Sequence, residues 1–310
     1  MKAAMLHAPG DLRIEDVPKP EPRPGDVLVQ IEVALTDGTD LKTFRRGHPV
    51  LLRDAPAPFG HEFCGIVDDR RVVAANSAPC GACDGCARGE QCRDLAFLSG
   101  AYADWIVVPE RIAAVNMHDV PAGLAPEVAA MVEPLACCLR GVERANVHAG
   151  DAVAILGAGP IGLMLAACVA DAGGWPTIVR GRPERQPLID EFGAEAGEGS
   201  GADVVIEAVG SEEAWIDALS LVRPGGTVVM FGGLPHDARP PVDAYRLHYE
   251  ELTVRGSFHH TPATVRAALG FLASGAYPWE RLVSHRVLLA DLPALFEDPP
   301  RDLLKAAVTP

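Results

Sequence analysis

The sequence predicts an α/β protein of two domains, one rich in β-strands and one built on a doubly wound parallel sheet. Its 310 residues match the length of two ordinary domains. Before Pro126 the chain consists of short apolar segments separated by Pro and Gly, which is typical of β-rich domains. After Pro126 apolar strands and helical segments alternate, and this alternation indicates right-handed crossovers in a parallel sheet.

The β-rich part contains a predicted antiparallel strand at residues 26–35. Its apolar residues Val27, Val29 and Ile31 alternate with the side chains between them, as in a strand with one buried face. Shorter apolar strands are expected at 66–67, 72–73 and 103–108. Together these segments predict a barrel-like domain.

The second part starts with a helical pattern at 127–142. Strands are expected at 152–157, 176–180, 203–208 and 226–232, and helices at 161–172, 183–192 and 212–221. The uncharged segment 152–170 is long enough to cross a bilayer, but its Gly and Pro residues favour a strand, a tight turn and a buried helix. This order of elements predicts a doubly wound sheet.

The C-terminal segment contains a predicted helix at 262–274, capped by Thr261 and ended by Gly275, and a strand at 282–289. It is too short to fold alone, so we expect it to return to the first domain. The predicted domains are therefore 1–133 together with 259–310, and 134–258.

The composition excludes one class of partner and favours one compartment. With a formal net charge of −15, the chain lacks the clustered Lys and Arg on which nucleic-acid binding depends. No apolar leader develops before Pro9, which predicts a cytoplasmic protein with no membrane partner. In that reducing compartment, cysteines stay as thiols or bind metal.

Four cysteines with short spacings form the pattern Cys80-x2-Cys83-x2-Cys86-x5-Cys92. Four thiolates at such spacings close a tetrahedral zinc site without an open position, so a structural zinc lobe is predicted at about residues 78–95. Four unrelated surface thiols are the alternative. The other cysteines lie in apolar surroundings and are expected to pack in the core: Cys64, Cys137, Cys138 and Cys168.

The pattern Gly157-x-Gly159-x-x-Gly162 lies directly between an apolar strand and an apolar helix. In that context it predicts a Rossmann dinucleotide-binding loop, because the glycines permit a tight turn and let the backbone approach a pyrophosphate. A tight turn without a ligand is the alternative. The predicted cofactor contacts are Gly157, Gly159, Pro160, Ile161 and Gly162 in this loop, and Val209, Gly210 and Gly232 at later strand ends, where they are equally consistent with plain turns.

The end of the second strand of this domain indicates which nicotinamide cofactor binds. An acidic residue there would hold the ribose 2′-hydroxyl of NAD, whereas this chain has Arg180, Arg182 and Arg185. Guanidinium groups suit the 2′-phosphate of NADP. NADP is therefore the preferred cofactor and NAD the second choice, with solvated arginines on an exposed turn as the alternative interpretation.

With these motifs the chain resembles the zinc-dependent medium-chain dehydrogenases over essentially its whole length, close to the sorbitol, threonine and glucose dehydrogenase branch. The resemblance implies a GroES-like catalytic domain and a Rossmann cofactor domain. It also implies a catalytic zinc site formed by three segments, here Asp37-Gly38-Thr39-Asp40, Gly60-His61-Glu62 and Glu133-Pro134-Leu135-Ala136. The implied ligands are Asp37, His61 and Glu133, with Glu62 either a ligand or the neighbour of one.

Three features depart from the family pattern. Asp37 stands where the family usually has cysteine, and its oxygen is a harder ligand, so we expect weaker or more exchangeable metal here than in the cysteine lobe. The fourth cysteine of the lobe follows after x5 instead of x7. Between Gly193 and Ala202 the usual strand and helix are nearly absent, which predicts a smaller adenosine side of the cofactor domain.

The resemblance implies a zinc-dependent oxidoreductase that transfers a hydride between a polyol, sugar or secondary alcohol and NADP or NAD. The family places a hydroxyl and a basic group for proton release at the positions of Thr39 and Lys42, although Lys42 is equally consistent with a solvated side chain. Oxygen ligands and few aromatic residues favour a polyol or sugar as substrate. A homo-oligomer, dimer or tetramer, is expected from the family.

Two other functions stay open from the sequence. One is a zinc-independent NADPH quinone or enone reductase of the same fold, in which Asp37 marks a lost catalytic site. The presence of His61, Glu62 and Glu133 argues against it. The other is a non-catalytic NADPH-binding redox sensor whose zinc lobe is an interaction surface.

Overall fold

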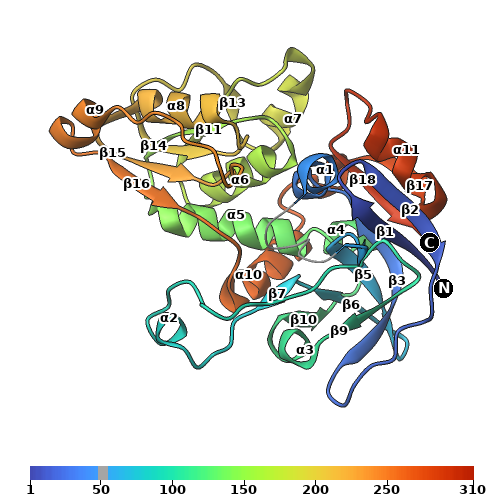
Figure 1. The fold of residues 1–310 in the computed structure, drawn as a ribbon. Coiled ribbons are helices and arrows are strands. Elements are labelled where there is room, and N and C mark those ends of the chain that lie inside the picture. Colours follow the sequence, from blue (N-terminus) through green and yellow to red (C-terminus); the bar gives the residue numbers. More distant parts are fainter. Residues whose placement is uncertain (48–54) are drawn as a thin grey trace. The chain divides into compact units, whose positions relative to one another are not determined.

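The computed structural model describes residues 1–47 and 55–310, which form two compact units (Figure 1). The first unit consists of Met1–Glu133 and Thr261–Pro310, and the second of Pro134–His260. The first unit is rich in strands, whereas the second alternates strands and helices.

Most strands of the first unit belong to one sheet, in the order β10-β6-β5-β3-β18-β17 with β9 beside β3. A second sheet has the order β2-β1-β4, and β7 pairs with β8. The strands are β1 (Lys2–Ala8), β2 (Asp11–Asp16), β3 (Val27–Leu35), β4 (Ala57–Pro58), β5 (Glu62–Val67), β6 (Arg70–Ala74), β7 (Ser77–Ala78), β8 (Ala96–Phe97), β9 (Trp105–Val108), β10 (Met117–Asp119), β17 (Val283–Leu288) and β18 (Lys305–Thr309). β18 pairs antiparallel with β3, so the C-terminal strand lies in the main sheet of the first unit.

The alternation in β3 determines which of its side chains enter the core. Val29, Ile31 and Val33 are buried, as the sequence pattern predicts. The rings of Tyr102 and Phe296 pack edge to face in the same core. The helices of this unit are α1 (Gly38–Arg46), α2 (Asp84–Ala87), α3 (Glu110–Asn116), α4 (Pro126–Ala129), α10 (Pro262–Ala273) and α11 (Leu292–Glu297).

Six parallel strands form the sheet of the second unit, in the order β13-β12-β11-β14-β15-β16. From β11 in the centre, the strands follow in chain order toward both edges of the sheet, which is the doubly wound Rossmann order. The predicted fold class is therefore confirmed. The strands are β11 (Ala152–Leu156), β12 (Trp175–Val179), β13 (Glu195–Ala196), β14 (Ala202–Glu207), β15 (Val222–Met230) and β16 (Thr253–Gly256). The helices are α6 (Pro160–Asp171), α7 (Gln186–Glu191), α8 (Glu212–Leu221) and α9 (Ala244–Tyr249), and α5 (Val132–Ala145) crosses from the first unit into the second.

A short loop replaces a crossover helix in this sheet. The described residues 197–201, between β13 and β14, contain no helix. Gly199 lies against the sheet with a φ of +65°, and a Cβ there would come within 2.6 Å of Val179 and 2.8 Å of Ala154. Only glycine combines this backbone conformation with so close an approach. The loop therefore covers with backbone a part of the sheet that a helix would cover with side chains.

The predicted continuous helix at 127–142 is wrong. The structure has two helices, α4 and α5, separated by a turn at Ala130 and Met131. The Met131 N–H donates to Val128 O, a 3₁₀-type bond that ends the first helix without a glycine or proline signal. The break places Glu133 in the first turn of α5.

The uncharged segment 152–170 forms β11, a glycine loop and most of α6, as predicted. Within the described part of the chain, no helix is both long and apolar enough to span a membrane.

Candidate functional site

Asp37 has two roles at the point where β3 gives way to α1. Its Oδ1 accepts a hydrogen bond from Asp40 N at 2.7 Å, and Asp40 Oδ2 accepts one from Asp37 N at 3.3 Å, so the two residues form a capping box. The second oxygen, Oδ2, lies 3.9 Å from His61 Nε2. One oxygen of Asp37 thus caps the helix while the other faces His61.

His61 is buried, and a hydrogen bond at Nδ1 fixes the orientation of its ring. Its Nδ1 lies 3.0 Å from Asp40 Oδ1, while Asp40 Oδ2 accepts a hydrogen bond from the Tyr102 hydroxyl. With Nδ1 donating to Asp40, Nε2 carries the lone pair that a metal requires. The sequence analysis did not assign Asp40, although an acidic residue three positions after an acidic N-cap is the signal that could have found it.

The donor atoms of Asp37, His61 and Glu62 fit a metal ion. One ligand atom from each lies within 4.8 Å of the others. The 3.9 Å between Asp37 Oδ2 and His61 Nε2 is too long for a hydrogen bond. Two ligands that each lie about 2.0–2.2 Å from zinc can be at most about 4.4 Å apart, so this distance suits a shared ion.

The electrostatics of the site also favour a cation. Burial alone would lower the pKa of His61, but the negative charges of Asp40 and Asp37 raise this pKa well above its usual value. The charge of Glu133 adds to the shift, so this carboxylate, which is only 5% exposed, lies near the histidine. Excess buried negative charge of this kind is stabilised by a divalent cation.

Glu62 is engaged by a residue that the sequence analysis missed. Lys305 Nζ donates to Glu62 Oε1 at 2.8 Å and to Oε2 at 2.6 Å, and neither residue is exposed to solvent. Burial would lower the pKa of Lys305, but the charges of Glu62, Asp37 and Asp40 and the hydrogen bonds to Glu62 together raise it. No local sequence signal marks Lys305, because its partner is 243 positions away.

Thr39 and Lys42 lie in α1, and both side chains are half-buried. The Thr39 hydroxyl forms a hydrogen bond with Asp37, where it helps to lower the pKa of that carboxyl against the effect of burial. Lys42 also has contacts with its surroundings. Thr39 therefore touches a candidate metal ligand.

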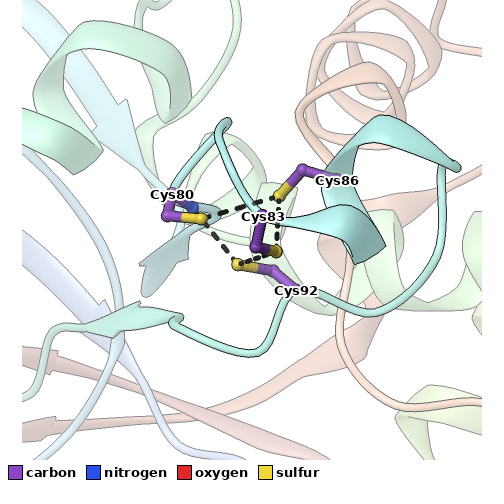
Figure 2. Close-up of side chains that lie close together, drawn as sticks. All are labelled: Cys80, Cys83, Cys86 and Cys92. Atoms are coloured by element: carbon purple, nitrogen blue, oxygen red, sulfur yellow. Dashed lines mark hydrogen bonds between the residues drawn. The ribbon is translucent and has the colours of Figure 1, made fainter.

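The four cysteines of the predicted lobe converge around α2 (Figure 2). The Sγ–Sγ distances are 3.9 Å for Cys80–Cys86, 3.6 Å for Cys83–Cys86 and 3.9 Å for Cys83–Cys92. Hydrogen bonds from the backbone of Arg93 and Cys86 lower the pKa of Cys83 to about 6. All four thiols point inward within ligand distance of one centre, as a tetrahedral zinc site requires.

The glycine loop has the geometry of a dinucleotide-binding turn. Gly157 has a φ of +106°, and a Cβ on Gly162 would lie 1.9 Å from Gly157 O, so both positions require glycine. Gly159 is the N-cap of α6, Pro160 is the first residue of that helix, and Ile161 follows it. Since nothing lies within 4 Å of a Cβ built on Gly159, the space in front of the helix N-terminus is open there.

The three other predicted cofactor residues meet at the carboxyl ends of β14 and β15. A Cβ on Gly232 would lie 2.4 Å from Gly210 N, and one on Gly157 would lie 3.1 Å from the Val209 side chain. Glu207, fully buried and not assigned from the sequence, accepts hydrogen bonds from Val209 N and Gly210 N, both at 2.7 Å. Its carboxylate therefore fixes the shape of this loop.

The three arginines beyond β12 differ in their surroundings. Arg180, with a φ of +61°, donates to Glu213 at 3.1 Å and forms an ion pair with Asp217, and both acids lie on α8. Arg182, which is exposed, precedes a short 3₁₀ turn (Pro183–Arg185), and Arg185, which is half-buried, is the last residue of that turn. The cationic charge of Arg180 is thus already neutralised, which the sequence did not reveal.

Comparisons with known proteins identify the family. The family model for "Alcohol dehydrogenase GroES-like domain" matches residues 23–122, and that for "Zinc-binding dehydrogenase" matches residues 194–274. An erythritol/L-threitol dehydrogenase from Mycolicibacterium smegmatis is 31% identical over 94% of this chain and 92% of its own. The chain belongs to the zinc-binding medium-chain dehydrogenase family. The prediction of an oxidoreductase of this family, with its GroES-like domain, is confirmed.

Other members of this medium-chain dehydrogenase family are similar over nearly their whole length. A sorbitol dehydrogenase from Halalkalibacterium halodurans is 29% identical over 92% of this chain and 91% of its own. A solved structure described as a zinc-binding dehydrogenase from Sinorhizobium meliloti, bound to NADP, is 31% identical and covers 100% of this chain and 99% of its own, with a TM-score of 0.89. The family fold therefore extends across the whole chain.

Proposed function

We propose that this dehydrogenase transfers a hydride between a polyol, sugar or secondary alcohol and NADP or NAD, with zinc as its metal. The observation that carries the proposal is the buried cluster of Asp37, His61 and Glu62, whose donor atoms lie within 4.8 Å of one another. The names of the relatives, which are dehydrogenases of sorbitol and of erythritol or threitol, support a polyhydroxylated substrate.

In this proposal, Met1–Glu133 with Thr261–Pro310 is the catalytic domain and Pro134–His260 the nucleotide-binding domain. Asp37, His61 and Glu133 hold the catalytic zinc, with Glu62 beside them. A zinc ion there supplies Lewis acidity, which lowers the pKa of a bound hydroxyl. The four cysteines of the lobe hold a second, structural zinc.

The residues around the catalytic site orient ligands and move a proton. Asp40 fixes the ring of His61 through Nδ1, so that Nε2 points to the ion. The hydroxyl of Thr39, held in place by its hydrogen bond with Asp37, would accept the proton of the substrate as it passes its own proton to the neutral amine of Lys42, which releases it to solvent. Lys42, in the next turn of α1, is the proposed outlet for that proton.

NADP is the preferred cofactor of this proposal. At the end of β12, Arg180 stands where an acidic residue would hold a ribose hydroxyl, and Arg182 and Arg185 follow it. A 31% identical structure was solved with NADP. Arg180 contributes less to binding of the NADP 2′-phosphate than its position in the sequence suggests, because Glu213 and Asp217 neutralise its charge. NAD is the second choice.

We also propose a homo-oligomer in the cytoplasm. β16 is an edge strand of its sheet, and its Val254 is 42% exposed. On α9, the rings of Tyr245 and Tyr249 pack against each other and are 68% and 69% exposed, and exposed apolar surface of this kind marks interaction sites. An open strand edge with apolar neighbours is a surface on which a second copy can pair. The free cysteines suit a reducing compartment.

The test is a metal count per chain combined with reduction of NADP and of NAD over a panel of polyols, aldoses and secondary alcohols. We expect two zinc ions per chain and NADP-linked oxidation of a polyol or sugar. A single zinc with NADPH-linked reduction of quinones or enones would replace this proposal with that of a zinc-independent reductase. Cofactor binding without turnover on the whole panel would indicate a non-catalytic sensor.

A further inference from the structure

Arg180 is the first residue after β12, at the point where a Rossmann domain contacts the ribose of the adenosine. Its φ of +61° lies in the left-handed region, which residues other than glycine seldom adopt. Such a conformation persists only where the surrounding structure enforces it. The chain therefore has an arginine at the position that distinguishes NAD from NADP, although the backbone there would suit glycine better.

Two carboxylates on one face of α8 hold the guanidinium group of Arg180. Its Nη2 donates to Glu213 Oε1 at 3.1 Å and forms an ion pair with Asp217 Oδ2. Glu213 and Asp217 are four positions apart, so their side chains lie on the same face of the helix. The helix dipole favours an acidic residue in the first turn, such as Glu213, but it does not account for Asp217 in the second turn. What the two acids share is their pairing with Arg180.

These ion pairs are accessible to a ligand. The side chains of Arg180, Glu213 and Asp217 are 44%, 76% and 31% exposed. Ion pairs at such a surface are weak, so a bound anion can replace the carboxylates. The 2′-phosphate of NADP carries about two negative charges and has three acceptor oxygens, which form strong paired hydrogen bonds with a guanidinium group. The phosphate and the two carboxylates are therefore rival partners of one cation.

We propose that Glu213 and Asp217 are specificity-determining residues that compete with the 2′-phosphate of NADP for Arg180 and so reduce the preference of this chain for NADP over NAD. This inference rests on the proposed function, because it assumes a nicotinamide dinucleotide at the glycine loop. NADP must displace the carboxylates and stay close to their negative charges, whereas NAD brings no charge to this position. The preference thus depends on α8 as well as on the end of β12.

The test measures the binding of adenosine 2′,5′-bisphosphate, NADP, AMP and NAD by calorimetric titration, which requires no turnover. Glu213→Gln combined with Asp217→Asn should tighten the binding of the two 2′-phosphorylated nucleotides about five- to tenfold, because removing one exposed ion pair gains up to about fivefold. Binding of AMP and NAD should change by less than about twofold. Glu212→Gln, which removes the same charge from an exposed residue of the same helix, is the matched control and should leave all four affinities within about twofold.

Arg180→Met separates this competition from a general effect of charge. In a protein with Arg180→Met, removing the two acids should no longer tighten the binding of NADP. A gain of the same size without Arg180 would overturn the inference. An absence of any gain with Arg180 present would also overturn it, because the 2′-phosphate would then depend on Arg182 and Arg185 alone.

A purely structural role of the ion pairs predicts a different result. If they only tied α8 to β12, the double variant would unfold at a lower temperature and bind all four nucleotides more weakly, which would overturn the inference. Glu213→Gln alone, at the most exposed of the three residues, gives an independent answer if the double variant does not fold, and it should tighten NADP binding about two- to fivefold. If the unmodified protein bound none of the four nucleotides, the proposed function itself would fail.

Discussion

The cysteine lobe and the Asp37–His61–Glu62 site are two candidate metal sites built in opposite ways. All four ligands of the lobe lie within residues 80–92, on one loop and the short helix α2. The other site draws Asp37 from the start of α1, His61 and Glu62 from the start of β5, and a counter-charge from β18. The first site is specified by spacing along the chain, and the second by the pairing of distant strands.

Their donor atoms differ just as clearly. Four sulfur atoms surround the lobe site, whereas one nitrogen and several carboxylate oxygens surround the other. Thiolates bind zinc as soft ligands in a closed site, while carboxylates suit a more exchangeable ion. A difference between the two sites in how easily they release metal is therefore the measurable consequence.

Mild chelation should produce the largest effect. We expect the oxygen-rich site to lose its metal first, so that turnover is abolished while one zinc per chain stays bound and thermal stability changes little. Metal analysis and activity after timed dialysis against a chelator measure this. The variant Cys86→Ser is the matched control, because it should lose the lobe zinc and stability instead. Loss of the lobe metal before activity would reverse the comparison.

Asp40→Asn should weaken zinc binding at the oxygen-rich site by about 10- to 100-fold, because His61 loses the carboxylate that orients its ring. The lobe zinc should be unaffected. Competition with a zinc indicator measures both affinities, and Asp119→Asn, which breaks an exposed pair with Arg70, serves as the control. Equal affinity in Asp40→Asn and the unmodified protein would remove Asp40 from the orientation of His61.

Lowering the pH should weaken zinc binding more at the oxygen-rich site than in the lobe, and this effect should be smaller than those above. The pKa of His61 is raised well above its usual value by Asp40 and Asp37, so a proton competes with metal for Nε2 already near neutral pH. In the lobe, backbone hydrogen bonds lower the pKa of Cys83 to about 6, whereas burial raises the pKa of Cys86 to about 12. We expect the lobe to keep its zinc to lower pH because four thiolates bind zinc more strongly than carboxylates and one histidine do. Below the raised pKa of His61, affinity at the oxygen-rich site should fall about tenfold per pH unit. If the lobe released its zinc at a higher pH than the oxygen-rich site, this prediction would be contradicted.

Asp37→Cys should have the smallest effect on the stability of the protein, and its effect on the rate of zinc release is the informative one. The thiolate should slow zinc release, but cysteine is a poor N-cap, so α1 should lose about 1 kcal/mol of stability. Asp37→Asn is the matched control, because asparagine keeps the cap and removes the anionic oxygen. Chemical unfolding and zinc release rates measure the two effects. Unchanged zinc release from both Asp37→Cys and Asp37→Asn would exclude Asp37 from coordination.

The same contrast explains what could be predicted from the sequence. The glycine loop depends on neighbours in the chain, so its spacing alone predicted a tight turn, and Gly157 and Gly162 occupy positions that only glycine tolerates. Lys305 and the partners of Arg180 could not be found in this way, because Glu62 and α8 reach them only through the folded sheets. The turn at Ala130 and Met131 was not predicted, because two consecutive residues that favour helices give no sign of a break.

The position of Lys305 has a consequence for how the protein is made. During synthesis Glu62 leaves the ribosome 243 residues before the ammonium that neutralises it. The unit of Pro134–His260 is contiguous and can fold while the rest is still being translated, whereas the unit that begins first is completed last. A buried carboxylate without its counter-ion is unstable, so we expect the sheet around Glu62 to close only after β18 has emerged.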